Sequence, residues 1–136
     1  MGNRAVITTA PFAKKNVGIY LHWNGGKASI EGFLQAAKVL QWRGPTADES
    51  YALARLTQLI ATYFGPDGLS VGIGLVGDLD PDNGDNGTYL IGGDWEIVGR
   101  KFYSGEEEVD PTKTAGIVRN ILAKIKAADA AKPEAA

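Results

Sequence analysis

The chain contains a single histidine, His22, and no cysteine, and these two counts limit its chemistry. Without cysteine, disulfides, thiolate zinc sites and cysteine nucleophiles are all excluded, and one histidine cannot form a multi-histidine metal cage. The spacing places no acidic residue beside His22, and no other side chain stands in a recognisable setting for a nucleophile. We therefore expect a protein that is not an enzyme and that needs no metal and no cofactor.

The segment around His22 has a second possible chemistry, which is binding of an anionic ligand. Residues 17–23 alternate between apolar and other side chains, which predicts a strand with Tyr20 and His22 on the face opposite the core. If the last strand faces the same way, Arg100 joins them, and the glycine turn at 24–26 leaves backbone amides uncovered. This combination of aromatic and basic side chains with uncovered backbone amides is suited to binding a small anionic or nucleotide ligand. The predicted ligand-binding residues are Tyr20, His22, Trp23, Asn24, Gly25, Gly26, Arg43 and Arg100.

A structural interpretation of the same segment stays open. Val17, Ile19, Leu21 and Trp23 fall together on the other face of the predicted strand. Trp23 would then close the core, and His22 would form a hydrogen bond with a neighbouring strand. Substitution of His22 and of Arg43 distinguishes the two interpretations, because a binding residue affects activity without affecting the melting temperature.

Two glycine motifs match enzyme patterns by letter but not by context. Residues 68–72 fit G-x-S-x-G, but a nucleophile elbow needs a strand before the serine and a helix after it, and the sequence predicts the reverse order. Residues 72–77 fit G-x-G-x-x-G, but the acidic turn 78–81 follows where a dinucleotide site needs a helix. Glycines within a strand instead indicate a bulge or close packing of a large neighbour.

The segment 78–87, Asp-Leu-Asp-Pro-Asp-Asn-Gly-Asp-Asn-Gly, has the composition of a calcium-binding loop. It is not an EF-hand, because Asn83 stands where the sixth-position glycine belongs and Tyr89 where the twelfth-position glutamate belongs. We expect its side chains to bond their own backbone in Asx-turns. The alternative is an irregular calcium site, which would make the chain a calcium-dependent binding module.

Hydrophobic periodicity predicts three helices with recognisable ends. Ser29 is the expected N-cap of the first helix, and the second begins with a capping box, Thr46-Ala47-Asp48-Glu49. The last helix begins at Asp110-Pro111, with aspartate as the cap and proline in the first turn. The predicted strands cover residues 5–9, 17–23, 69–76, 88–91 and 95–103.

The resulting order, β-β-α-α-β-β-β-α, indicates an α+β fold. We expect a single, mainly antiparallel sheet of about five strands with three helices packed on one face. Residues 1–128 form one predicted α+β domain, and 129–136 a flexible C-terminal tail, since the tail has no apolar stripe.

Charge is segregated along the chain although the formal net charge is only −2. Residues 1–65 carry a net +4, residues 66–111 a net −9 and residues 112–136 a net +3. The balance argues against direct nucleic-acid binding by the whole surface, while the basic side is suited to an anionic partner. No apolar stretch is long enough to span a membrane, so we expect a soluble, cytoplasmic protein, and a homo-oligomer stays open.

Three segments resemble a known group of proteins: Gly2-Asn3-Arg4-Ala5-Val6-Ile7, residues 19–26 (Ile-Tyr-Leu-His-Trp-Asn-Gly-Gly) and residues 82–89 (Asp-Asn-Gly-Asp-Asn-Gly-Thr-Tyr). The chain is similar, over roughly residues 1–105, to a family of small, largely uncharacterised proteins of phages, prophages and other mobile elements. The resemblance implies an accessory protein acting in the host cytoplasm. It implies an anti-defence factor that binds a host defence protein or sequesters a nucleotide signal, and it carries over no catalytic residue.

Overall fold

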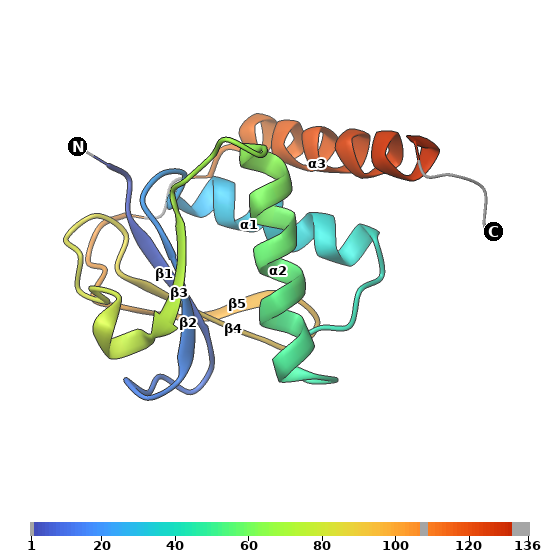
Figure 1. The fold of residues 1–136 in the computed structure, drawn as a ribbon. Coiled ribbons are helices and arrows are strands. Elements are labelled where there is room, and N and C mark those ends of the chain that lie inside the picture. Colours follow the sequence, from blue (N-terminus) through green and yellow to red (C-terminus); the bar gives the residue numbers. More distant parts are fainter. Residues whose placement is uncertain (1, 107–108, 132–136) are drawn as a thin grey trace.

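Five strands and three helices follow one another in the predicted order in the computed structural model, which describes residues 2–106 and 109–131 (Figure 1). The strands form one sheet in the order β3-β2-β1-β4-β5. Every neighbouring pair is antiparallel except β1 and β4, which are parallel, so the prediction of a mainly antiparallel sheet is confirmed. The elements are β1 (Ala5–Thr9), β2 (Val17–Leu21), α1 (Lys27–Val39), α2 (Glu49–Phe64), β3 (Val71–Leu75), the 3-10 turn η1 (Val76–Asp78), β4 (Thr88–Gly92), β5 (Glu96–Lys101) and α3 (Pro111–Ala131).

The helices all lie on one side of the sheet, as predicted, but in two tiers. Strand alternation directs Ile7, Ile19 and Tyr89 toward α1 and α2, and all three are fully buried in the core. Helix α3 packs on α1 and on the C-terminal end of α2 rather than on the sheet (Figure 1). Gly32 of α1 permits this contact, because an added Cβ would come within 2.8 Å of an Ile117 methyl carbon.

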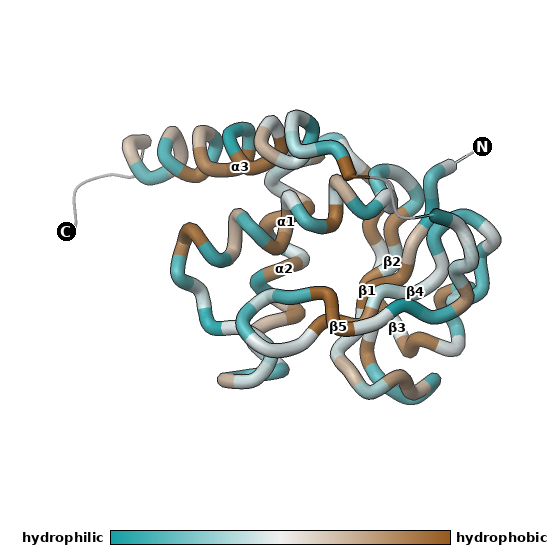
Figure 2. Tube along the Cα trace, turned by 180° about the vertical axis from the view of Figure 1, so that it is seen from behind, coloured by the Kyte–Doolittle hydropathy of each residue, from teal (hydrophilic) through white to brown (hydrophobic). Residues whose placement is uncertain are grey.

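The opposite face of the sheet is covered by the segment 76–87, which lies away from the helices in Figure 1. Its apolar part packs on glycines: a Cβ on Gly18 would meet Val76 at 2.9 Å, and one on Gly74 would meet Leu79 at 3.2 Å. Close packing of large neighbours therefore explains these strand glycines, in agreement with the sequence interpretation. Figure 2 shows the hydrophobic stretches of β1 and β2 surrounded by more hydrophilic loops.

Two predicted helix starts are corrected. Helix α1 begins at Lys27 with Gly26 as N-cap, and Ser29 is buried inside the first turn instead of capping the helix. In α2 the cap is Asp48, whose carboxylate accepts from the Tyr51 amide. The Glu49 carboxylate accepts from the Thr9 hydroxyl at 2.6 Å, so a tertiary contact replaces the local bond of the capping box.

The last helix begins as predicted, since the Asp110 carboxylate accepts from the Lys113 amide at 3.1 Å. It continues to Ala131, three residues beyond the predicted domain boundary at 128, and residues 132–136 of the predicted tail lie outside the described residues. Lys124 donates to the carbonyl oxygens of Thr62 and Tyr63 and so joins α3 to the C-terminal end of α2. No described helix has the length and hydropathy needed to cross a membrane.

Candidate functional site

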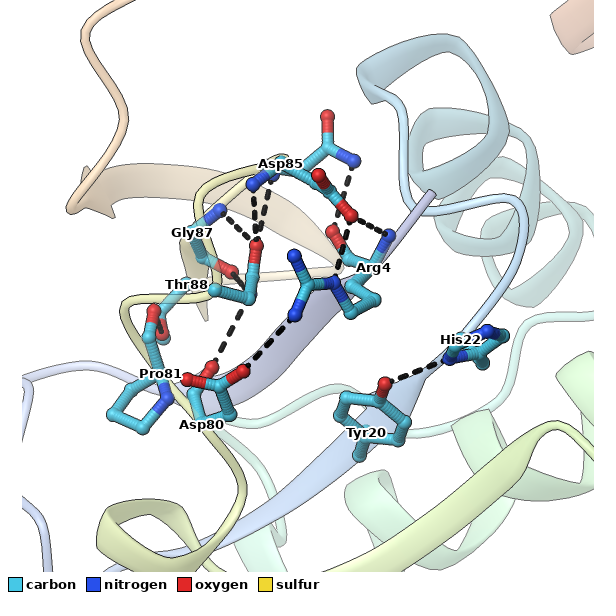
Figure 3. Close-up of polar contacts among 10 residues, drawn as sticks. Arg4, Tyr20, His22, Asp80, Pro81, Asp85, Gly87 and Thr88 are labelled. Carbon is cyan, nitrogen blue, oxygen red and sulfur yellow. Dashed lines mark hydrogen bonds and ion pairs between the residues drawn. The ribbon is translucent and has the colours of Figure 1, made fainter. Parts of the chain in front are cut away.

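Tyr20 and His22 lie together on the sheet face opposite the helices. The Tyr20 hydroxyl is 3.0 Å from Nδ1 of His22 (Figure 3). The His22 ring contacts the Trp23 ring edge-on, with centroids 5.3 Å apart. Strand β2 ends at Leu21, so Trp23 does not continue the core face, and its surface is 47% exposed. The structural interpretation of Trp23 as a core residue is therefore wrong, while the predicted pairing of Tyr20 with His22 on one face is confirmed.

The turn 24–26 does not present open amides at its centre. The Gly25 amide donates to the carbonyl of Asn3 at 2.9 Å, and the Gly25 carbonyl accepts from the Tyr89 hydroxyl at 2.7 Å. A side chain at Gly25 would overlap the Asn3 carbonyl and approach the Ala5 Cβ to 2.8 Å. This glycine thus serves close approach of two backbone segments, which corrects the expectation that it leaves room for a ligand.

The two arginines do not join Tyr20 and His22. Arg100 pairs in register with Tyr89, so it projects from the helix-covered face and not from the face of Tyr20. Its guanidinium lies 3.9 Å from the centroids of both the Tyr89 and the Tyr103 rings. Arg43 follows the opposite end of α1, about 20 Å from Gly26 along a helix of 13 residues. There it stacks on Tyr51, at 5.6 Å from the ring centroid.

The acidic loop is organised around one buried amide. Oδ1 of Asn83 accepts from the backbone amides of Asp85, Asn86 and Gly87 at 3.0–3.1 Å, while Nδ2 donates to the carbonyls of Asp80 and Gly87. Asn83 is only 4% exposed. The predicted bonding of loop side chains to their own backbone is therefore confirmed at this residue.

The negative charge of the loop faces Arg4 (Figure 3). Its guanidinium lies 2.8 Å from Asp85 and 3.2 Å from Asp80, and its backbone amide also donates to Asp85. The side-chain hydrogen bond from Arg4 holds the pKa of Asp85 below its usual value, and the same bond raises the pKa of Arg4. Within residues 2–106 and 109–131, no cluster of three or more His, Asp or Glu side chains has the geometry to hold a metal ion.

A groove of about 810 Å³ runs between α1 and β5. The helix contributes residues spaced by about one turn, and six consecutive residues line the other side, namely Trp95 and residues 96–100 of β5. Side chains alternate between the two faces of a strand, so a pocket over one face would be lined by alternate residues only. Lining by consecutive residues places this groove along the edge of the strand. β5 is the last strand of the sheet, so in the part of the chain that the structure describes this edge has no neighbouring strand.

The groove combines an apolar floor with a charged rim. Leu34 and Trp95 lie at its base and are almost fully buried. Along the rim, Lys27 lies 3.7 Å from Glu31, and a second ion pair of 4.0 Å joins Lys38 of α1 to Glu96 of β5. This groove was not among the features predicted from the sequence. The polar stripe of Lys27, Glu31, Gln35 and Lys38 on α1 was visible in the sequence, but the edge position of β5 depends on strand order.

A smaller polar cavity of about 300 Å³ adjoins the groove and shares Lys27 and Arg100 with it. Gly26 also lines this cavity, so two of the predicted binding residues, Gly26 and Arg100, meet here and not beside His22. The cavity lies at the N-terminus of α1, and Lys113 of α3 contributes a further positive charge. Asp85 and Asp110 also line it, but each already accepts hydrogen bonds, from Arg4 and from the Lys113 amide.

The structure thus contains two concave regions around one edge strand, and Arg100 belongs to both. No protein-family model matches the chain, and neither the curated proteins nor the solved structures contain a match.

Proposed function

We propose that this chain is a non-enzymatic binding protein that holds an extended segment of a partner protein in the groove between α1 and β5. The observation that carries the proposal is the position of the groove along the unpaired edge of β5, where six consecutive residues line it. An extended peptide can add to such an edge as a further strand, with main-chain hydrogen bonds supplying affinity and side-chain pockets supplying specificity.

The groove also defines the kind of segment that fits. In a strand added beside β5, alternate side chains face α1 and contact the apolar floor around Leu34 and Trp95. The remaining side chains face the opposite side of the sheet. Lys27 and Lys38 are eleven residues apart, or about 16 Å along the helix, which matches the length of a five-residue strand. The best partner is therefore a short extended segment with alternating apolar side chains.

A binding role is also consistent with the chemistry around the single histidine. His22 is hydrogen-bonded to Tyr20 and packs on Trp23, and it lines neither of the two cavities that contain Arg100. The resemblance of residues 1–105 to mobile-element proteins supports an accessory factor that binds a host defence protein. In that setting the extended segment belongs to the host protein.

Selection from random peptides displayed on phage tests this proposal directly. The purified chain is the bait, and enriched peptides are synthesised with a fluorescent label and titrated by fluorescence polarisation. We expect enriched sequences with alternating apolar residues, and loss of their binding in Gln35→Trp, which places a large ring in the groove. Gln35 is exposed, so the substitution leaves the core intact.

The matched control is Gln58→Trp, the same substitution at an exposed position of α2 that is not part of the groove. It should bind the selected peptides like the unmodified chain. Equal binding by Gln35→Trp and the unmodified chain would show that the peptides bind elsewhere and would contradict the proposal.

The second candidate function is sequestration of a nucleotide in the polar cavity at the start of α1. It is favoured by the fixed position of the Arg100 guanidinium, which two tyrosine rings hold and whose Nη2 donates to the Asn86 carbonyl. A thermal-shift screen with inorganic phosphate and cyclic nucleotides tests it, because a ligand that binds the native state raises the melting temperature. A shift that disappears in Arg100→Gln would support nucleotide binding over peptide binding.

A further inference from the structure

The two edges of the sheet differ in their protection against pairing with another chain. β5 contains a bulge at Val98 and carries three charged residues, which disfavour its pairing with an apolar edge strand of a second copy. The other edge strand, β3, has a regular register and no charged residue, and no charge occurs in residues 68–77. Ile73 and Leu75 on this strand are 59% and 47% exposed. An exposed apolar edge with a regular register is a template for pairing with a strand of another chain.

We propose that β3 pairs antiparallel with β3 of a second copy of this chain, so that the two sheets join into one across a two-fold axis at Ile73. This dimer surface is separate from the peptide groove, since β3 and β5 lie at opposite ends of the sheet.

The backbone of β3 is oriented for this pairing. On its inner side, the His22 amide donates to the Ser70 carbonyl at 3.0 Å, and the Val76 amide donates to the Asn16 carbonyl at 2.8 Å. Because hydrogen-bonded residues alternate along an antiparallel pair, Ser70, Gly72, Gly74 and Val76 point their amides and carbonyls toward β2. The amides and carbonyls of Val71, Ile73 and Leu75 consequently point to the open edge.

The sequence of β3 is nearly symmetric about Ile73, reading Val-Gly-Ile-Gly-Leu. With the two-fold axis at Ile73, this residue pairs with its own copy, and Val71 pairs with Leu75 of the second copy. Each of these is a hydrogen-bonded pair that exchanges two bonds. Apolar side chains then lie opposite apolar side chains on one face, and glycines lie opposite glycines on the other. Such self-complementarity is what a two-fold interface requires, since the same patch serves both subunits.

The helix layer continues this surface. An apolar groove of about 410 Å³ lies between α2 and the strands β2 and β3, and its lining includes Val17, Leu53, Ala54 and Ile73. A two-fold axis perpendicular to the sheet keeps both α2 helices on the same side. Ile73 of the second copy therefore faces this groove. The strand is about 17 Å long and α2 about 24 Å, so a face of these dimensions covers roughly 400 Å² per copy, about half of a standard interface of ~800 Å² per partner. We expect a dimer with a dissociation constant in the micromolar range.

Single-cysteine variants test the register, because the chain has no cysteine of its own to interfere. Across the proposed axis, the Cα atoms of the two copies of residue 73 are about 5.5 Å apart, which is within the range of a disulfide. Ile73→Cys should form a covalent dimer under mild oxidation. Leu75→Cys should not, because its two copies are about 14 Å apart along the strands. The matched control is Val98→Cys, because Val98 lies on the β5 edge and is about as exposed as Ile73. This variant should stay monomeric.

Sedimentation equilibrium over a range of concentrations tests the dimer without cross-linking. Ile73→Lys should weaken the association by at least about tenfold, because it places two like charges opposite each other. Val98→Lys should leave the association unchanged. Far-ultraviolet circular dichroism checks that both variants fold, which their exposed positions favour. A chain that stays monomeric at high micromolar concentration, or cross-linking of Val98→Cys and Ile73→Cys to the same extent, would overturn the proposal.

Discussion

The buried amide of Asn83 determines the conformation of the acidic loop, and its removal should destabilise the whole protein. Of its five hydrogen bonds, those with the Asn86 amide, the Gly87 amide and the Gly87 carbonyl are fully buried. A buried hydrogen bond contributes about 1 kcal/mol to stability, so Asn83→Ala should lower the free energy of unfolding by about 3 kcal/mol. For a domain of this size, the melting temperature should fall by about 10 °C. The effect is global because the loop covers one face of the sheet.

Urea denaturation of three variants measures this effect and its cause. Asn83→Asp keeps the acceptor oxygen but places a carboxylate oxygen against the carbonyls of Asp80 and Gly87, so at neutral pH its loss of stability should be at least as large as that of Asn83→Ala. Asp82→Ala removes an exposed carboxylate from the same loop and should change stability by less than about 0.5 kcal/mol. A loss below about 1 kcal/mol in Asn83→Ala would refute the reasoning, since the freed backbone groups would then have found other partners.

Four further results are expected. The Gly25→Ala variant should fold poorly, or its free energy of unfolding should fall by several kcal/mol in thermal denaturation, because the added methyl group overlaps the Asn3 carbonyl. The pKa of Asp85 in the folded protein is lowered from 3.8, so its contribution to stability is complete at neutral pH and is lost as the pH falls through that lowered value. Urea denaturation at pH values below about 5 should therefore show a smaller loss of stability with falling pH in Asp85→Asn than in the unmodified chain. Calcium should leave the melting temperature unchanged, since Arg4 already pairs with both Asp80 and Asp85 and no acidic cluster of the described residues has the geometry of a metal site. Arg43→Glu should retain peptide binding in polarisation assays.

Local pattern predicted the elements well because it reports what each segment buries. The alternation around Ile19 and the apolar stripe of α2 at Leu56 and Ile60 describe faces that the sheet and helices do bury. Helix starts were less predictable. Glu49 has the spacing of a capping box, but its carboxylate accepts a hydrogen bond from the Thr9 hydroxyl, forty residues away in the chain. A tertiary contact of this kind has no local signal.

The candidate site depends on strand order, and the sequence does not encode strand order in any local pattern. Arg100 was expected beside Tyr20, but the parallel pairing of β1 with β4 puts β5 at the far edge of the sheet. The register with Tyr89 then turns Arg100 to the helix side. The same two facts place Arg100 beside the groove along β5, with neighbours other than the Tyr20 and His22 expected from the sequence.

Amide hydrogen exchange of β5, with and without a selected peptide, is the most direct test of the proposed binding mode. Strand addition forms new main-chain hydrogen bonds, so a saturating peptide should slow the exchange of amides within residues 96–101. Amides of β3, within residues 71–75, are the internal reference and should exchange at the same rate in both samples when the protein concentration is equal. Slower exchange in β5 alone is the result that the edge-strand groove predicts. A peptide that binds tightly and leaves the exchange of residues 96–101 unchanged would contradict it.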